Sequence, residues 1–253
     1  MKRTLLLCLL LAMVGFAVAD TYTIGNGTST ENYIPTYGFY DYGWSKTIYT
    51  AAEINAAGLM SGGNLIALGY EVGNTPANYT TVNQMVYLRH TTANIYEATE
   101  NTLPDSTLFT LVYQGDLTWN GGGWHYVMFN APFAWNGTDN IEIMWRNWDG
   151  DYASGYPKFR YTTTTPAYTG VNKYLDANFP AVDGTITYNR ANIQLITPTT
   201  TAPDPAVAVS PLNGATLVSP GATLNWMPGN IWPDGYYFSY GTDPAATNIV
   251  NNQ

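Results

Sequence analysis

Basic residues are scarce in this chain of 253 residues. Nine lysines and arginines stand against 18 aspartates and glutamates, which gives a formal net charge of −9. Binding to a nucleic-acid backbone depends on clustered lysine and arginine, so this balance argues against nucleic acid as a partner. Charged residues make up only 11% of the chain and aromatic residues 15%, a composition that favours half-buried pleated surfaces.

Cysteine and histidine are nearly absent as well. Cys8 is the only thiol and lies in the N-terminal apolar segment, so the rest of the chain must rely on a core or on bound ions instead of disulfides. His90 and His125 both fall in expected strands, and two histidines are too few for a metal centre without further histidine or cysteine ligands. Because there is also no Gly-x-Ser-x-Gly motif and no distinctive carboxylate pair, we predict that the chain is not an enzyme.

Apolar runs long enough to span a membrane are missing. Residues 1–19 join Lys2 and Arg3 to a short apolar stretch and end in the small residues Ala17-Val18-Ala19, which is the pattern of a cleaved secretory signal peptide. A membrane-spanning helix needs about 20 apolar residues, and no run reaches that length. We therefore expect a secreted or cell-surface protein with no membrane span in its mature chain.

Short runs of alternating apolar and polar residues fill most of residues 20–196. Each has the length of a strand and is bounded by Gly, Asn, Asp or Pro. The clearest runs are residues 64–72, 82–90, 107–115, 123–130 and 140–148. One short helix is expected after Thr50, with Glu53 completing a capping box. Many strands and almost no helix predict an all-β protein whose first domain is a jelly-roll-like antiparallel β-sandwich.

The pattern breaks at residues 197–205, a Pro/Thr-rich stretch that predicts an extended linker. Residues 206–253 then contain "SPLNGAT" at 210–216, "ATLNW" ending in Trp226, and "GYYFSYGTD" at 235–243. These segments resemble a bacterial fibronectin type III or Ig-like repeat. Since only three or four of its about seven strands are present, we expect a partial domain and a longer protein.

The first domain resembles a module of secreted and surface proteins from Bacteroidota- and Cloacimonadota-type bacteria. The resemblance rests on "YGFYDYGWSKTIYTAAEI" at 37–54, "GGNLIALGYEV" at 62–72 and "APFAWNGTDNIEIMW" at 131–145. It implies a β-sandwich joined to fibronectin-like repeats, and it implies no catalytic residues. Some such modules precede peptidases or glycan-active domains.

A loop after residue 146 carries acidic side chains at alternate positions. Asn147, Asp149 and Asp151 in "NWDGDYASG" resemble the opening of a calcium loop, since Ca²⁺ prefers several oxygen ligands from a tight turn that contains glycine. No glutamate follows within the loop, as the EF-hand pattern requires. The alternative is a solvated acidic turn. Ca²⁺ is the only cofactor that the sequence suggests.

Aromatic residues cluster in or beside glycine-rich loops. Their rings can stack on the apolar faces of sugars, while neighbouring Asn and Asp side chains bond the hydroxyl groups. The candidate ligand-binding residues are Trp119, Trp124, Trp148, Tyr152 and Tyr156. The segment "YGFYDYGW" adds Tyr37, Tyr40, Tyr42 and Trp44 beside Asp41. The alternative for any one of them is a place in the core.

Three functions remain open from the sequence. The first is a non-catalytic recognition or adhesion module that contacts glycan or a surface protein. The second is an accessory module of a secreted hydrolase, a peptidase or glycoside hydrolase, whose catalytic domain lies beyond residue 253. The third is a structural spacer.

Overall fold

A computed structural model describes residues 19–198, 207–210, 223 and 225–227. The chain divides into two compact units, of which the larger is Asp20–Thr197. Residues 1–18 of the expected signal peptide, most of the expected linker and the segment at residues 235–243 lie outside the described residues. Within the part that is described, no helix is long and apolar enough to cross a membrane.

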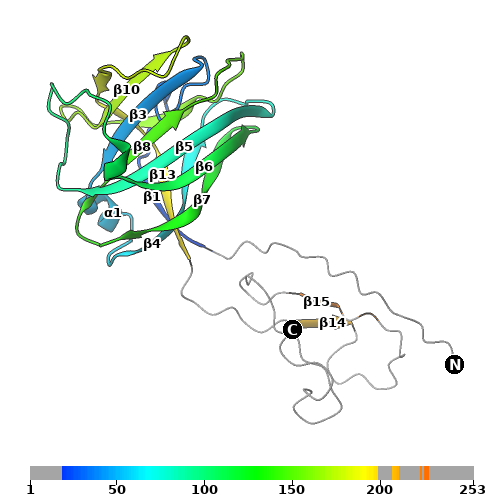
Figure 1. Cartoon of the computed structure of the whole chain (residues 1–253). Helices are drawn as coiled ribbons and strands as arrows, with labels where there is room; N and C mark the ends of the chain where they lie inside the picture. The colour runs from blue at the N-terminus through cyan, green and yellow to red at the C-terminus, as the bar shows by residue number, and fades with distance from the viewer. Residues whose placement is uncertain (1–18, 199–206, 211–222, 224, 228–253) are drawn as a thin grey trace. The chain divides into compact units, whose positions relative to one another are not determined.

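Two β-sheets build the larger unit (Figure 1). The first sheet contains β1 (Ala19–Ile24), β13 (Ile193–Pro198), β4 (Gly63–Val72) and β7 (Gly123–Trp135), extended at one end by β9 (Phe159–Thr163), β12 (Asn189–Ala191) and β2 (Thr30–Glu31). The second contains β11 (Thr185–Thr187), β10 (Gly170–Leu175), β3 (Tyr42–Tyr49), β8 (Asn140–Asn147), β5 (Tyr79–Thr91) and β6 (Thr110–Trp119).

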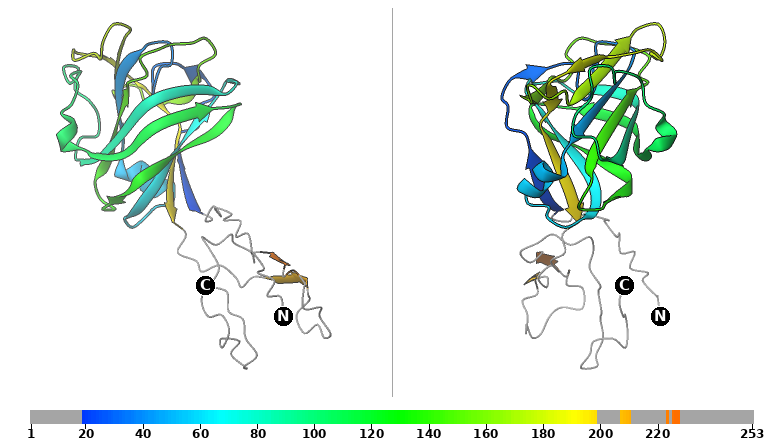
Figure 2. Two further views of the ribbon diagram at one scale, coloured as in Figure 1. Left: turned by 45° about the vertical axis from the view of Figure 1, so that its right-hand side comes forward. Right: turned by 90° about the vertical axis from the view of Figure 1, so that its left-hand side faces the viewer.

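The strand order is that of a jelly roll. Taken in chain order, the eight principal strands are β1, β3, β4, β5, β6, β7, β8 and β13. One sheet places the first, eighth, third and sixth of them side by side, and the other places the second, seventh, fourth and fifth. The pairings are antiparallel. Two interlocked Greek keys produce this order, so the predicted all-β, jelly-roll-like sandwich is confirmed. Figures 1 and 2 show β1 and β13 leaving the sandwich at the same end.

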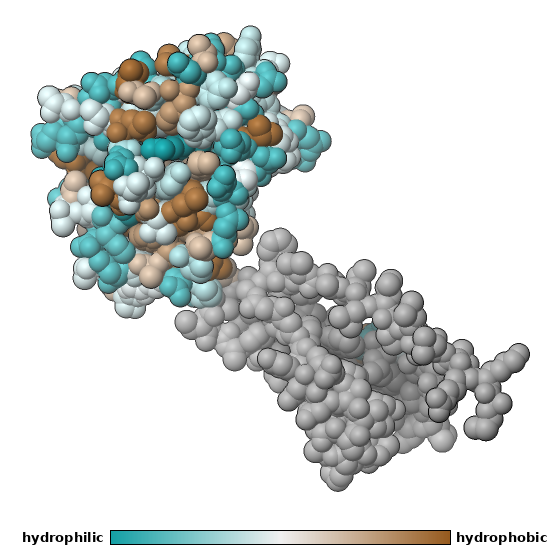
Figure 3. All heavy atoms as spheres, viewed as in Figure 1, coloured by the Kyte–Doolittle hydropathy of each residue, from teal (hydrophilic) through white to brown (hydrophobic). Residues whose placement is uncertain are grey.

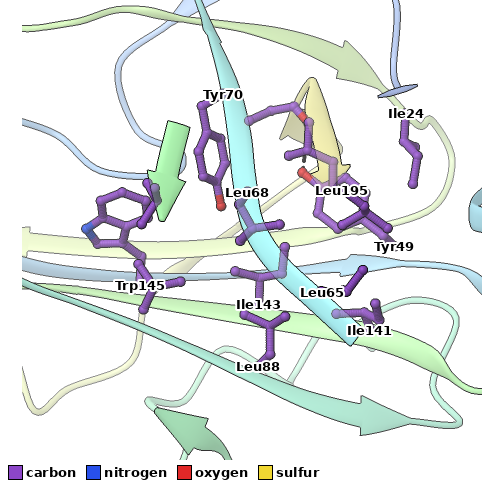
Figure 4. Packing of buried hydrophobic residues seen from close by; sticks show 14 of the residues in the cluster. Ile24, Tyr49, Leu65, Leu68, Tyr70, Leu88, Ile141, Ile143, Trp145 and Leu195 are labelled. Carbon is purple, nitrogen blue, oxygen red and sulfur yellow. Dashed lines mark hydrogen bonds between the residues drawn. The ribbon is translucent and has the colours of Figure 1, made fainter. Parts of the chain in front are cut away.

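The core lies between the two sheets, where alternate residues of each strand point inward. Figure 4 shows Leu68 close to Ile143 and Leu88. Tyr70 packs edge-on against Trp145, with ring centroids 5.6 Å apart. All five residues are buried. These contacts join β4 of one sheet to β5 and β8 of the other, and they supply the apolar burial that a chain without disulfides requires.

Strand β8 is buried on both faces. Its inner face carries Ile141, Ile143 and Trp145, and its outer face carries the buried carboxylate of Glu142. Arg89 Nε donates to Glu142 Oε2 at 2.6 Å, and the Tyr96 hydroxyl donates to Oε1 at 2.8 Å. The pairing is what makes burial of this carboxylate tolerable, because an unpaired buried charge is costly.

The short helix α1 (Ala51–Ala56) begins as the sequence predicts. The Thr50 side chain accepts from the Glu53 backbone N–H, and the Glu53 carboxylate accepts from the Thr50 N–H, so both halves of the capping box are present. Glu53 also pairs with the buried guanidinium of Arg190. The cap thus ties the helix to β12.

A bulge in β5 turns one amide into the core. The register of β5 against β6 shifts between Thr81 and Gln84, and Asn83 takes a left-handed backbone conformation with φ of 50°. The Gln84 side chain is fully buried. It accepts from Trp145 Nε1 at 2.7 Å and donates to Asn147 Oδ1 at 2.5 Å and to the Val82 carbonyl at 2.8 Å.

The second unit contains a two-stranded antiparallel sheet. Strand β14 (Val207–Ser210) pairs with β15 (Asn225–Met227). Both strands lie within residues 206–253, where the sequence predicts a partial fibronectin-like domain.

Replacing Gln84 by leucine should destabilise the domain by about 2–4 kcal/mol, because the substitution leaves the buried Trp145 indole N–H without its acceptor and removes one of the two donors to Asn147 Oδ1. Urea unfolding of the purified protein measures the loss. Gln114→Leu on the exposed face of β6 is the matched control and should change the free energy of unfolding by less than about 0.5 kcal/mol. Equal effects from the two substitutions would contradict a structural role for the buried amide.

Candidate functional site

A pocket lies among the loops at one end of the sandwich. It has a volume of about 500 Å³, within the range of about 300–1,000 Å³ that ligand pockets occupy. Its wall is formed by Phe39, Asn74, Tyr152, Ser154, Gly155, Tyr156 and Lys158. These residues come from the loop before β3, the turn after β4 and the loop between β8 and β9. We call this the aromatic pocket.

Tyr37 lies at the centre of the aromatic side chains around this pocket. Its ring centroid is 5.8 Å from that of Phe39, 5.3 Å from that of Tyr156 and 5.2 Å from that of Tyr40. Phe39 in turn contacts Tyr152, with centroids 5.6 Å apart. Most of the ring pairs in this group pack edge to face. Such a pair stabilises the folded state by about 0.5–1.5 kcal/mol beyond the burial of its apolar area.

Two rings of this group remain open to solvent. The side chain of Phe39 is 43% exposed and that of Tyr152 is 56% exposed. Large aromatic side chains normally bury most of their area. Two adjacent exposed rings at the wall of a pocket therefore form an apolar surface that a flat ligand face can cover.

The loops that carry these rings are fixed by buried or half-buried side chains. Asn74 Nδ2 donates to the Tyr156 carbonyl at 2.9 Å, and Asn74 Oδ1 accepts from the Lys158 N–H at 2.7 Å. The Tyr79 hydroxyl donates to the Gly38 carbonyl at 2.6 Å. A Cβ at Gly38 would lie 2.8 Å from the Tyr156 Cβ, so the close approach of the two loops requires glycine there.

The side chain of Asn147, one of the three predicted metal ligands, forms hydrogen bonds that hold these loops. Its Oδ1 accepts from Gln84 Nε2 and from the Asp149 N–H at 3.1 Å, and its Nδ2 donates to the Tyr40 carbonyl at 3.1 Å. With these bonds made, the amide joins the loop after β8 to the loop before β3. It holds both walls of the aromatic pocket.

Asp149 and Asp151 lie in the acidic loop beside the pocket. Asp149 Oδ1 accepts from the Val82 N–H at 3.2 Å, and Asp151 Oδ1 accepts from the Tyr152 N–H at 2.8 Å. Burial raises the pKa of the Asp149 carboxyl to about 6; the Val82 N–H opposes this rise, and the charges of Asp151, Asp116 and Asp41 add to it. No three His, Cys, Asp or Glu side chains of the described residues form a group that could hold a metal ion.

The three predicted tryptophans lie away from the pocket. Trp119 is only 2% exposed and packs in the core, with its ring centroid 5.2 Å from that of Phe159. Trp124 is half-buried on β7. Trp148 is stacked on Phe179 at 4.2 Å between ring centroids. Of the five predicted ligand-binding residues, the structure brings Tyr152 and Tyr156 into the pocket wall.

The sequence analysis missed Phe39, Asn74 and Lys158. Phe39 lies within the aromatic segment "YGFYDYGW", from which only the tyrosines and Trp44 were predicted as binding residues. Asn74 and Lys158 are single polar residues that no motif marks. Only the approach of their loops reveals them.

Both histidines of the chain are engaged in local structure. His90 Nε2 accepts from the Asn136 N–H at 3.2 Å and its ring packs on Phe133. His125 bonds the Gly121 carbonyl at 3.1 Å and packs on Trp119. Neither histidine lines the aromatic pocket.

The face of the domain over β5 and β6 is a mixed surface. Figure 3 shows small hydrophobic patches on this face, separated by hydrophilic residues. Isolated exposed apolar residues of this kind are normal on a folded domain.

Comparisons with known proteins give no information on the function of this chain. No protein-family model matches the chain, and no curated protein matches it significantly.

Asp149→Asn should raise the melting temperature at pH 7–8. The folded-state pKa of about 6 lies above the ordinary value of 3.8, so this carboxyl lowers the free energy of unfolding progressively as pH rises from about 3.8 to about 6, and the loss is complete above 6. The asparagine can still accept from the Val82 N–H, and the gain should vanish below about pH 3, where the carboxyl is protonated in both states. Thermal unfolding at several pH values tests this. Asp183→Asn at an exposed position is the charge-matched control, and an equal, pH-independent gain there would contradict the assignment.

Calcium provides a second test of the same loop. From the alternate spacing of Asn147, Asp149 and Asp151, we expect Ca²⁺ to raise the melting temperature of the protein and Asp149→Asn to abolish that rise, because a bound cation stabilises the state that binds it. Melting curves that are identical in Ca²⁺ and in EDTA would show that the loop is an acidic turn without a metal.

Proposed function

We propose that residues 20–197 form a non-catalytic recognition module of an exported protein, and that the module binds glycan at the aromatic pocket. The observation that supports this function most directly is the pair of exposed rings, Phe39 and Tyr152, in the wall of a pocket of about 500 Å³. A sugar ring presents an apolar C–H face of similar size. Stacking of that face on an aromatic ring removes apolar surface of both partners from water.

Polar groups in the same wall can orient such a ligand. Ser154, Tyr152 and Tyr156 each carry a hydroxyl group that can both donate and accept a hydrogen bond. A mainly apolar wall with a few polar groups is the usual composition of a binding site for a small ligand.

The rigidity of the pocket also supports recognition. Asn74, Tyr79 and Asn147 fix the backbone of the two loops by hydrogen bonds within the protein. Loops that are already ordered lose less conformational entropy when they bind, so more of the contact energy contributes to affinity.

Tyr152→Ala should lower glycan affinity about tenfold, because it removes the more exposed stacking surface of the pocket. A glycan array selects a binding oligosaccharide, and calorimetry with that oligosaccharide measures the change. Tyr126→Ala is the matched control: Tyr126 is 49% exposed but lies on β7, outside the pocket.

Equal affinity of the Tyr152→Ala variant and the original protein would remove the aromatic pocket from the site. A blank array with the folded protein would overturn the glycan-binding function and favour a spacer or a protein-binding role.

A further inference from the structure

Lys158 provides the only positive charge in the wall of the aromatic pocket. Its side chain is exposed, and it forms no ion pair with any residue that the structure describes. Lys173 also forms no ion pair among the described residues, but it is half-buried on β10 and lies outside the pocket.

The other basic side chains of the domain are engaged. Arg89, Arg160 and Arg190 pair with carboxylates. Arg146 donates to the Pro104 carbonyl at 3.2 Å, and Lys46 is buried with its ammonium 4.5 Å from the centroid of the Tyr96 ring. Among the described residues, Lys158 is thus a cation that remains available to a ligand at the pocket.

The backbone of Lys158 is held at a fixed place. Its N–H donates to Asn74 Oδ1 at 2.7 Å, and its carbonyl accepts from the Gly73 N–H at 2.8 Å. The neighbours Pro157 and Phe159 are both buried. Because the backbone of Lys158 is fixed at the start of β9, its ammonium group can reach only the space near that point. This space lies beside Tyr156 in the pocket wall.

The net charge of the chain makes this one cation significant. At −9 the protein repels anions, and Asp151, the neighbour of Tyr152 in the chain, adds a negative charge close to the pocket. Salt at about 0.15 M screens repulsion only beyond about 8 Å. An anionic ligand that reaches the pocket therefore depends on a local positive charge. A neutral sugar would need only the rings and the hydroxyl groups.

We infer that the ligand of the aromatic pocket is an acidic sugar, whose ring stacks on Phe39 and Tyr152 while its anionic substituent pairs with Lys158. This inference rests on the proposed glycan-binding function and names the ligand class for the same site. A carboxylate and a sulfate share the chemistry that a lysine ammonium recognises.

The test compares three short oligosaccharides in calorimetry with the purified full chain at about 0.15 M salt. The first is an oligouronate of four to six residues, the second is the same oligosaccharide with its carboxyl groups reduced, which makes it neutral, and the third is the reduced oligosaccharide with sulfate esters added. Short chains avoid the gain from multivalent binding. We expect an acidic oligosaccharide to bind about fivefold more tightly than the neutral one, the upper range for an exposed ion pair.

Lys158→Met should lower the affinity for the acidic oligosaccharides to that for the neutral one and so remove this preference. Lys173→Met makes the same change in net charge away from the pocket and should keep the preference. Lys158→Arg restores the charge and should keep it too, which separates loss of the cation from any disturbance of the loop. Preference for the uronate alone or for the sulfated sugar alone identifies the acidic group.

Equal affinities of the original protein for acidic and neutral oligosaccharides would overturn the acidic-ligand inference and leave the glycan-binding function standing. Equal losses in Lys158→Met and Lys173→Met would also overturn it, because the effect would then come from net charge. Absence of binding to every oligosaccharide would overturn both proposals.

Discussion

The buried amides of Gln84 and Asn147 hold together the end of the sandwich where the pocket lies. Gln84 reaches the core because β5 bulges at Asn83, and it bonds the Trp145 indole, the Asn147 side chain and its own strand. Asn147 continues the chain of bonds to the Tyr40 carbonyl. Since every link is buried or half-buried, breaking one leaves a polar group without water, and this penalty favours a single arrangement of the loops.

That arrangement explains how aromatic rings can remain exposed in a stable domain. Phe39 and Tyr152 gain little from burial, so their positions must come from the backbone that carries them. Tyr79 fixes Gly38 and Asn74 fixes Tyr156, and Tyr37 fills the space between the loops. The core and the amide network supply the stability, and the exposed rings at the wall of the pocket contribute little to it.

In the acidic loop too, one side chain supports the backbone while the others lie at or near the surface. Asn147, which its spacing suggests as a calcium ligand, uses its side chain to support the loops. Asp149 lies partly buried among Asp41, Asp116 and Asp151, and burial and these charges raise its pKa to about 6. A carboxyl in this environment resists ionisation, so the stability of the domain depends on pH through this loop.

The sequence by itself determined the all-β class, the inward face of β8 and the cap of α1, because alternation and capping depend on neighbours a few residues apart. It also placed Tyr152 and Tyr156 among the candidate binding residues. Only the tertiary structure decided that Trp119 belongs to the core, and that Phe39, Asn74 and Lys158 meet Tyr156 at one pocket. Aromatic residues serve cores and surfaces equally well. Which role each takes depends on strands and loops brought together by the jelly-roll order, and this information does not lie in any local pattern.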